Sequence, residues 1–121
     1  MTIQLTVWHN PRCSKSRKTL ELLEKRGFKP QVRKYLEDPP TQEELDQALE
    51  ALNLAPRELM RRKEAEYEEL DLADAARTRE ELIGAMVNHP VLIQRPVVMT
   101  SDGRAALGRP PESVLSLLDE D

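Results

Sequence analysis

The sequence contains a single cysteine, Cys13, and this scarcity excludes two kinds of chemistry. One cysteine cannot form a disulfide within the chain, and Cys-x-x-Cys redox cycling is excluded because Ser16 occupies the position of the second thiol. With only two histidines beside that cysteine, no metal site is expected. Any redox reaction of this protein therefore needs a thiol from outside the chain.

Long hydrophobic runs are also missing. No apolar run approaches the roughly 18 residues that a membrane-spanning helix needs. The polar residues Gln4 and Thr6 interrupt the N-terminal apolar segment, so it does not resemble a signal peptide. We therefore expect no membrane partner and a cytoplasmic location.

The chain has no excess of basic residues, because its net charge is −4. Broad nucleic-acid binding is therefore not expected, although a local basic cluster occurs at residues 61–63. A length of 121 residues, with 39% hydrophobic and 33% charged residues, is typical of one soluble domain. We predict a single domain over residues 1–121.

The cysteine lies where a strand pattern changes into a helix pattern. Apolar and polar residues alternate over residues 2–7, which predicts a strand, and leucines at helical spacing predict a helix over residues 14–26. The segment from His9 to Arg17 is therefore a strand-to-helix loop. Either Ser14 or Ser16 is a candidate cap for the helix that follows.

A cysteine at a helix N-terminus is favoured as a thiolate. Free backbone N–H groups and the positive end of the helix dipole stabilise negative charge, and Arg12, Lys15 and Arg17 add cations nearby. The same groups suit a tetrahedral oxyanion. We predict a reactive Cys13 with a lowered pKa beside an anion site; the alternative is a small buried cysteine with no reactivity.

The rest of the chain reads as strand, helical insertion, hairpin and final helix. Two capping boxes, Thr41 with Glu44 and Thr78 with Glu81, predict helix starts. We expect a strand near a sheet edge at residues 30–36, parallel to the first strand. Between these boxes and after them we expect helices that end near residues 52 and 88, short helical segments at 56–61 and 64–70, and a linker-like stretch at 72–78. Strands at 97–99 and 104–107 are expected to form a hairpin with a tight turn at 101–103. A last helix is opened by Pro110 and Pro111, with Val114, Leu115 and Leu118 facing inward.

Several separated motifs make the chain resemble the ArsC-type, glutaredoxin-coupled arsenate reductase family, including its arsenate-reductase-like branch. The motifs are His9-Asn10-Pro11-Arg12-Cys13 with Ser16-Arg17, Tyr35-Leu36-Glu37 running into Pro39-Pro40-Thr41, Glu58-Leu59-Met60-Arg61, Ile93-Gln94-Arg95-Pro96 and Gly108-Arg109-Pro110. The resemblance covers essentially the whole chain. It implies an α/β, thioredoxin-like fold with a mixed four-stranded sheet flanked by helices and a helical insertion between the βαβ and ββα halves.

The resemblance also implies a set of site residues. Cys13 is the implied nucleophile, and Arg61, Arg95 and Arg109 are the implied oxyanion-binding arginines. Arginine suits this task on general grounds, because its planar fork pairs with oxyanion oxygens and stays charged. The implied supporting residues are His9, Asn10, Ser16, Arg17 and Pro96, with a cis peptide bond before Pro96 and a loop-holding role favoured for His9 over proton transfer.

The implied reaction is the reduction of arsenate to arsenite. Cys13 attacks arsenate, glutathione acts as co-substrate and glutaredoxin resolves the adduct, with no tightly bound cofactor. The single cysteine fits this scheme, because reduction needs two electrons and one thiol cannot supply both.

The sequence departs from the family pattern at Ser14-Lys15, where characterised members tend to have Gly-Thr. Two alternatives therefore stay open. One is a glutathione-linked thiol oxidoreductase acting on another oxyanion or on a protein thiol. The other is a regulatory binding protein similar to the Spx-like factors, which typically carry Cys-x-x-Cys.

Overall fold

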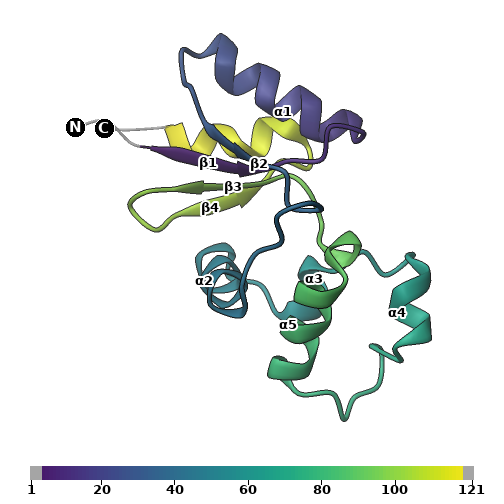
Figure 1. The fold of residues 1–121 in the computed structure, drawn as a ribbon. Coiled ribbons are helices and arrows are strands. Elements are labelled where there is room, and N and C mark those ends of the chain that lie inside the picture. Colours follow the sequence, from purple (N-terminus) through teal and green to yellow (C-terminus); the bar gives the residue numbers. More distant parts are fainter. Residues whose placement is uncertain (1–3, 119–121) are drawn as a thin grey trace. The chain divides into compact units, whose positions relative to one another are not determined.

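A mixed four-stranded sheet forms the centre of the first of two units in this protein (Figure 1). The computed structural model describes residues 4–118 and divides the chain into a sheet unit, Met1–Asp38 with Arg95–Asp121, and a helical unit, Pro39–Gln94. Each unit is described separately below. The single domain predicted over residues 1–121 stays a prediction.

The sheet has the strand order β2-β1-β3-β4. The central strand β1 (Leu5–Trp8) pairs in parallel with β2 (Gln31–Arg33) and antiparallel with β3 (Val97–Thr100), which pairs antiparallel with β4 (Ala105–Leu107). This confirms the edge position and the parallel pairing predicted for β2. The expected start of the first strand, at residues 2 and 3, lies outside the described residues.

Strand β2 is shorter than the predicted span of residues 30–36. After Arg33 the chain turns, because the carbonyl of Lys34 accepts hydrogen bonds from the N–H groups of Glu37 and Asp38, at 3.0 and 2.9 Å. The Arg33 Nε also donates to the Asp38 carbonyl at 2.9 Å. These bonds close a turn where the sequence suggested extended chain.

One face of the sheet is covered by helix α1 (Ser14–Lys25) and the 3-10 helix η2 (Pro111–Leu118) (Figure 1). The core between these layers consists of Leu5, Val7, Leu23, Val98, Val114 and Leu117. Residues three apart share a face in a 3-10 helix, so η2 buries Val114 and Leu117. The prediction that Val114 and Leu118 face inward is confirmed, because Leu118 is partly buried and packs against this core. The prediction for Leu115 was wrong, since Leu117 is the buried side chain in its place.

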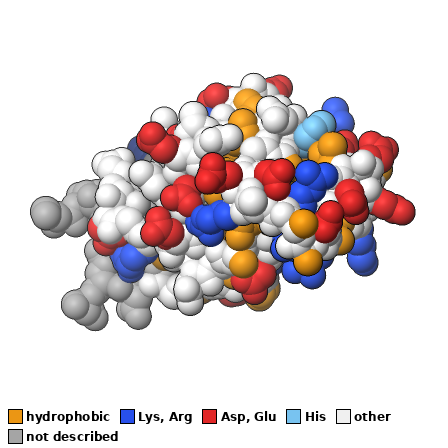
Figure 2. All heavy atoms as spheres, turned by 90° about the horizontal axis from the view of Figure 1, so that it is seen from below, with side chains coloured by type: hydrophobic (Ala, Val, Ile, Leu, Met, Phe, Trp, Pro, Cys, Tyr) orange, Lys and Arg blue, Asp and Glu red, His pale blue; other side chains and the backbone are white. Residues whose placement is uncertain are grey.

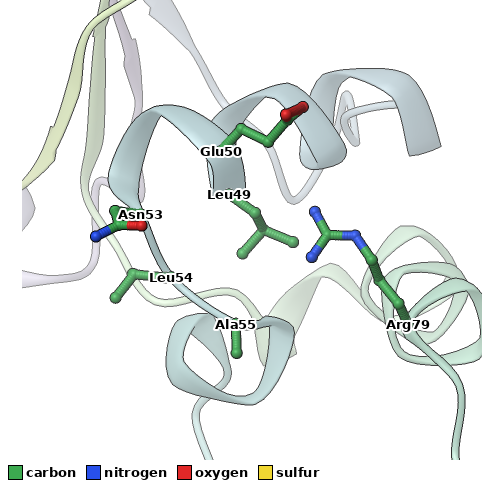
Figure 3. A pocket seen from close by; sticks show the side chains of 6 residues that line it. All are labelled: Leu49, Glu50, Asn53, Leu54, Ala55 and Arg79. Atoms are coloured by element: carbon green, nitrogen blue, oxygen red, sulfur yellow. The ribbon is translucent and has the colours of Figure 1, made fainter.

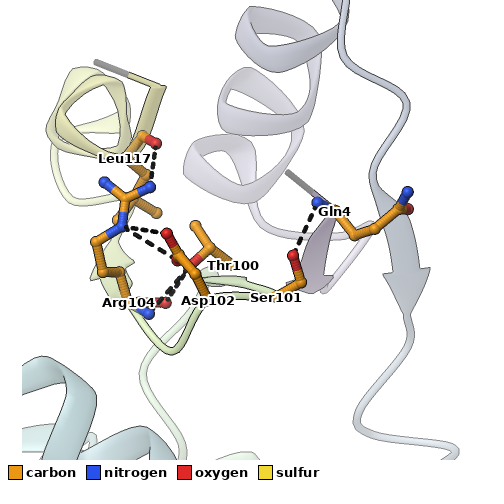
Figure 4. Close-up of polar contacts among 6 residues, drawn as sticks. All are labelled: Gln4, Thr100, Ser101, Asp102, Arg104 and Leu117. Atoms are coloured by element: carbon orange, nitrogen blue, oxygen red, sulfur yellow. Dashed lines mark hydrogen bonds and ion pairs between the residues drawn. The ribbon is translucent and has the colours of Figure 1, made fainter. Parts of the chain in front are cut away.

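The turn between β3 and β4 is the predicted hairpin, and side chains close it (Figure 4). Thr100 Oγ1 accepts a hydrogen bond from the Arg104 N–H at 2.9 Å and donates to the Asp102 carboxylate. Arg104 pairs with Asp102 and donates from Nη2 to the Leu117 carbonyl at 3.2 Å. The Thr100 hydroxyl and then the Arg104 guanidinium lower the pKa of Asp102. The hairpin is thus tied to η2.

The helical unit consists of α2 (Gln42–Leu52), α3 (Pro56–Leu59), α4 (Ala65–Glu69), α5 (Arg79–Asn88) and the 3-10 helix η1 (Pro90–Leu92). Both predicted capping boxes are confirmed, at Thr41 for α2 and at Thr78 for α5. Helix α5 packs against α2, α3 and η1. It contributes Leu82, Ile83 and Met86 to the buried side chains of this unit.

Helix α3 ends earlier than predicted. Met60 is extended and forms an isolated antiparallel bridge with Ile93, and the Arg61 N–H donates to the Leu92 carbonyl at 2.7 Å. These long-range bonds compete with continuation of the helix through Arg61. The linker-like stretch at 72–78 has no helix, but Arg57 donates to the carbonyls of Leu72 and Asp74 at 2.9 and 2.6 Å.

Gly108 is required by close packing beneath β4. A Cβ atom on this residue would lie 2.4 Å from Thr19 Oγ1 and 2.7 Å from Pro96 Cγ. We expect Gly108→Ala to lower the free energy of unfolding by about 1–3 kcal/mol, because neighbouring groups must shift. Urea unfolding measures this loss. The matched control is Gly84→Ala in α5, whose Cβ would meet nothing closer than 3.6 Å, and an equal loss in both variants would contradict the packing explanation.

Candidate active site

Cys13 lies at the end of the tight loop that follows β1. Its N–H donates to the Asn10 carbonyl at 3.0 Å, and the Asn10 side-chain oxygen accepts from the Arg12 N–H at 3.0 Å. Cys13 itself is the N-cap of α1, with φ −95° and ψ 122°, and no side chain caps the helix. The half-buried thiol therefore lies at the predicted place, beside the first N–H groups of α1.

Ser16 is buried beneath the loop and holds it. Its Oγ shares a hydrogen bond with His9 Nδ1 at 2.7 Å and accepts from the Asn10 N–H at 3.1 Å. The prediction that Ser14 or Ser16 caps the helix was wrong, because the Ser16 hydroxyl bonds back to the loop. The N–H groups of the first helical turn are thereby left to the thiolate.

The pKa of the Cys13 thiol is lowered. Partial burial acts in the opposite direction and raises it, but the backbone N–H of Ser16, the Arg95 side chain and the backbone N–H of Lys15 together outweigh burial. The lowered pKa of Cys13 agrees with the prediction from the sequence, but the cation that contributes to it is not one of those predicted. Arg95 supplies the nearby charge, whereas Arg12, Lys15 and Arg17 are exposed, and Arg17 donates to the Pro11 carbonyl at 2.7 Å.

His9 is buried and its pKa is lowered by burial first and then by the charges of Lys34 and Arg17. A neutral imidazole is suited to the hydrogen bond with Ser16. The His9 backbone N–H also donates to the Arg33 carbonyl at 2.8 Å, which ties the loop to β2. These contacts support the loop-holding role that we expected for His9.

Arg95 and Arg109 belong to the same unit as Cys13. The Arg95 Nε is buried and has no hydrogen-bond partner among the described residues, and Arg109 Nη1 donates to the Arg95 carbonyl at 3.1 Å. The peptide bonds before Pro96 and Pro110 are both cis. The first was expected from the resemblance; the second was not, because neither spacing nor composition distinguishes a cis from a trans bond.

Arg61 lies in the helical unit, where its guanidinium forms an ion pair with Glu64 at 2.5 Å. The neighbouring Arg62 donates to the Arg57 carbonyl at 3.3 Å, and Lys63 is exposed. Glu64 is a partner that the motif comparison did not predict. The role of Arg61 in oxyanion binding rests on the resemblance and stays a proposal.

The surface has two hollows of interest. One, of about 350 Å³, lies in the sheet unit beside the cysteine loop, and the other, of about 470 Å³, lies in the helical unit around Leu49 and Arg79 (Figure 3). Arg79 forms an ion pair with Asp46 at 2.7 Å, and the residues that line the second hollow include no cysteine, serine or histidine. Cys13, the nucleophile predicted from the sequence, lies in the sheet unit.

Within residues 4–118, no cluster of His, Cys, Asp and Glu is arranged to hold a metal ion. Over the same residues, no helix has the length and apolar character to cross a membrane. Figure 2 shows acidic and basic side chains interspersed on the face that it draws, so the cations on that face do not gather into one patch.

The bonds of Ser16 predict a stability effect. We expect Ser16→Ala to lower the free energy of unfolding by about 1–3 kcal/mol, because a buried backbone N–H and a buried imidazole lose their partner. Urea unfolding of this variant beside Ser14→Ala measures the effect, since Ser14 is exposed. Equal unfolding midpoints for the two variants would show that the Ser16 network does not stabilise the loop.

The chain matches the ArsC family model over residues 8–117. It is 50% identical over 119 residues, which are 98% of this chain and 99% of the relative, to uncharacterized protein YfgD of Escherichia coli K12. It is 45% identical over 116 residues, 96% of this chain and 82% of the relative, to the arsenate reductase of Yersinia enterocolitica.

The solved structure of an arsenate reductase from Vibrio cholerae superposes with a TM-score of 0.92 at 48% identity, covering 96% of this chain and 98% of that one. These similarities confirm the resemblance deduced from the motifs and the predicted thioredoxin-like fold. The chain therefore belongs to the ArsC family of arsenate reductases.

Proposed function

We propose that this protein reduces arsenate to arsenite with Cys13 as the only nucleophile and with glutathione and glutaredoxin as external thiols. One observation supports the proposal most directly: the Cys13 thiol faces the N–H groups of α1 and the Arg95 side chain, which together lower its pKa. The same groups suit the oxygens of a tetrahedral anion next to the sulfur. The relatives named arsenate reductases supply the substrate class.

In the first proposed step the Cys13 thiolate attacks arsenic, an S–As bond forms, and one protonated arsenate oxygen leaves as water. Arsenic remains pentavalent. Arg95 and Arg109 neutralise the remaining oxygens, and Arg61 is the proposed third arginine. Four supporting residues hold the cysteine loop: His9, Asn10 and Ser16 through the loop bonds, and Arg17 through the Pro11 carbonyl. The role of Pro96 beside the nucleophile rests on the resemblance.

In the second step the glutathione thiol displaces another oxygen as water, which leaves arsenic bonded to two sulfurs. A glutaredoxin thiol then attacks the glutathione sulfur and a disulfide forms between them. The two electrons of the broken S–As bond reduce arsenic to the trivalent state. Water finally displaces Cys13, which releases arsenite and restores the thiol. The chain thus needs only one cysteine.

The test is arsenate-dependent oxidation of NADPH in the presence of glutathione, glutaredoxin and glutathione reductase. We expect turnover that requires arsenate, glutathione and glutaredoxin, each shown by leaving that component out. If arsenate gives no rate above background while Cys13 is still readily glutathionylated, arsenate is not the substrate. Other oxyanions and protein disulfides in the same assay then test the alternative thiol oxidoreductase.

A further inference from the structure

A hollow of about 350 Å³ lies next to the cysteine loop and is formed entirely within the sheet unit. Its walls are two segments, the loop that follows β1 and the turn that follows β2. The lining residues are His9, Asn10, Pro11 and Arg12 from the first segment and Lys34, Leu36 and Glu37 from the second. The lining residue Arg12 directly precedes Cys13, so the hollow and the nucleophile share one loop.

The charges of the lining residues form a distinct pattern of two cations and one anion. Arg12, Lys34 and Glu37 are exposed, and none of these three side chains has an ion-pair partner in the part of the chain that is described. By contrast, Arg17 on the same loop is bonded to the Pro11 carbonyl. The three charges are therefore available to a ligand.

The walls of the hollow are fixed by backbone hydrogen bonds. The His9 N–H donates to the Arg33 carbonyl at 2.8 Å, which holds one wall to the other. The Asn10 side chain fixes the Arg12 N–H, and the turn bonds to the Lys34 carbonyl fix the Glu37 N–H. A preformed site loses less conformational entropy when a ligand binds.

We propose that this hollow is the subsite for the glutathione co-substrate, an inference that rests on the proposed function. Glutathione at neutral pH carries two carboxylates and one ammonium group, the complement of Arg12, Lys34 and Glu37. Pro11 and the 41% exposed Leu36 offer apolar surface to its methylene groups. The volume lies at the lower end of the range of small-molecule pockets, about 300–1,000 Å³.

The reach of a tripeptide fits this placement. An extended tripeptide spans about 10 Å, which is more than the distance of about 3.8 Å between the Cα atoms of neighbouring residues such as Arg12 and Cys13. We place the central thiol of the bound ligand toward Cys13, which follows the lining residue Arg12 in the chain. The arginines that are proposed to bind arsenate lie outside the lining residues, so the two substrates need not compete.

The test uses S-methylglutathione, which cannot react, and follows its binding to the wild-type protein by NMR chemical shifts and calorimetry. We expect shifts at the lining residues and a Kd about three- to ten-fold higher for Arg12→Gln and for Lys34→Gln, as suits exposed charge pairs. Lys18→Gln is the matched control, because Lys18 is exposed on α1 and outside the lining. Equal binding by all three variants would overturn the subsite.

An altered ligand tests Glu37 separately. N-acetyl-S-methylglutathione lacks the ammonium group. We therefore expect it to bind the wild-type protein more weakly than S-methylglutathione does. The Glu37→Gln variant should bind the two ligands equally well, because it lacks the carboxylate that pairs with the ammonium group. The subsite would be wrong if acetylation weakened ligand binding equally for the wild-type protein and Glu37→Gln. It would also be wrong if the NMR signals of the lining residues did not shift at about 20 mM ligand, a concentration well above a millimolar Kd.

Binding and turnover can fail independently. If arsenate is not reduced but the variants and the acetylated ligand behave as expected, the subsite stands and the proposed substrate falls. If arsenate is reduced, we expect Lys34→Gln to raise the KM for glutathione about three- to ten-fold while the KM for arsenate stays unchanged. A raised KM for arsenate alone would contradict the subsite.

Discussion

Cys13→Ser is expected to abolish arsenate-dependent NADPH oxidation, with a fall of at least about a thousand-fold in kcat/KM. Serine has nearly the same shape, but its hydroxyl stays protonated beside groups that stabilise a thiolate. It therefore cannot form the sulfur–arsenic bond on which both later steps depend. The coupled assay with glutathione, glutaredoxin and glutathione reductase measures the loss.

The fold of the Cys13→Ser variant should be unchanged, because Cys13 is half-exposed and its backbone N–H still reaches the Asn10 carbonyl. Ser14→Ala is the matched control: it alters the neighbouring exposed residue and should keep full activity. Turnover by Cys13→Ser at the wild-type rate would mean that the protein does not use a cysteine nucleophile.

Arg95→Ala is expected to raise the pKa of Cys13 and to lower kcat/KM for arsenate by about a hundred-fold or more. The Arg95 side chain stabilises the thiolate by hydrogen bonding and by charge, so without it burial acts on the thiol with less opposition. In the wild-type protein the lowered pKa of Cys13 favours the thiolate. In the variant the pKa is higher, so the thiolate forms, and alkylation begins, at higher pH. The rate of alkylation by iodoacetamide across pH measures the shift.

Two further variants separate the effect of charge from that of geometry. Arg95→Lys keeps the charge and should restore much of the lowered pKa but less of the turnover, because lysine cannot make the paired hydrogen bonds of a guanidinium. Arg109→Ala should reduce turnover and leave the alkylation profile nearly unchanged, since Arg109 contacts the Arg95 carbonyl rather than the thiol. If the pH profile of alkylation were the same in Arg95→Ala as in the wild-type protein, Arg95 would not stabilise the Cys13 thiolate.

Much of the local structure could be predicted from the sequence. Thr41 with Glu44 and Thr78 with Glu81 form the capping boxes that open α2 and α5, and residues 101–103 form the hairpin turn. These features depend on hydrogen bonds and periodicity between residues close in the chain. The position of Cys13 at the start of α1 is of the same kind, because a strand pattern, a break and a helix pattern follow one another there.

The family motifs extended the prediction to the fold, and the comparisons confirm it. They also pointed to Arg95 and Arg109, which the structure places in the unit that contains Cys13. Their contact with arsenate remains a proposal. No local rule would have found them, because an arginine before a proline has no pattern of its own.

The sequence by itself determined that a lone thiol stands at a helix N-terminus, and it predicted that a redox cycle would need external thiols. Tertiary structure decided which groups meet that thiol: Arg95 rather than the loop cations, and Ser16 as a support for the loop rather than a helix cap. It also ended α3 at Leu59, through the bridge between Met60 and Ile93. The physical reason is that near neighbours fix caps and turns, whereas contacts between distant segments form only when the chain has folded and can override local preference.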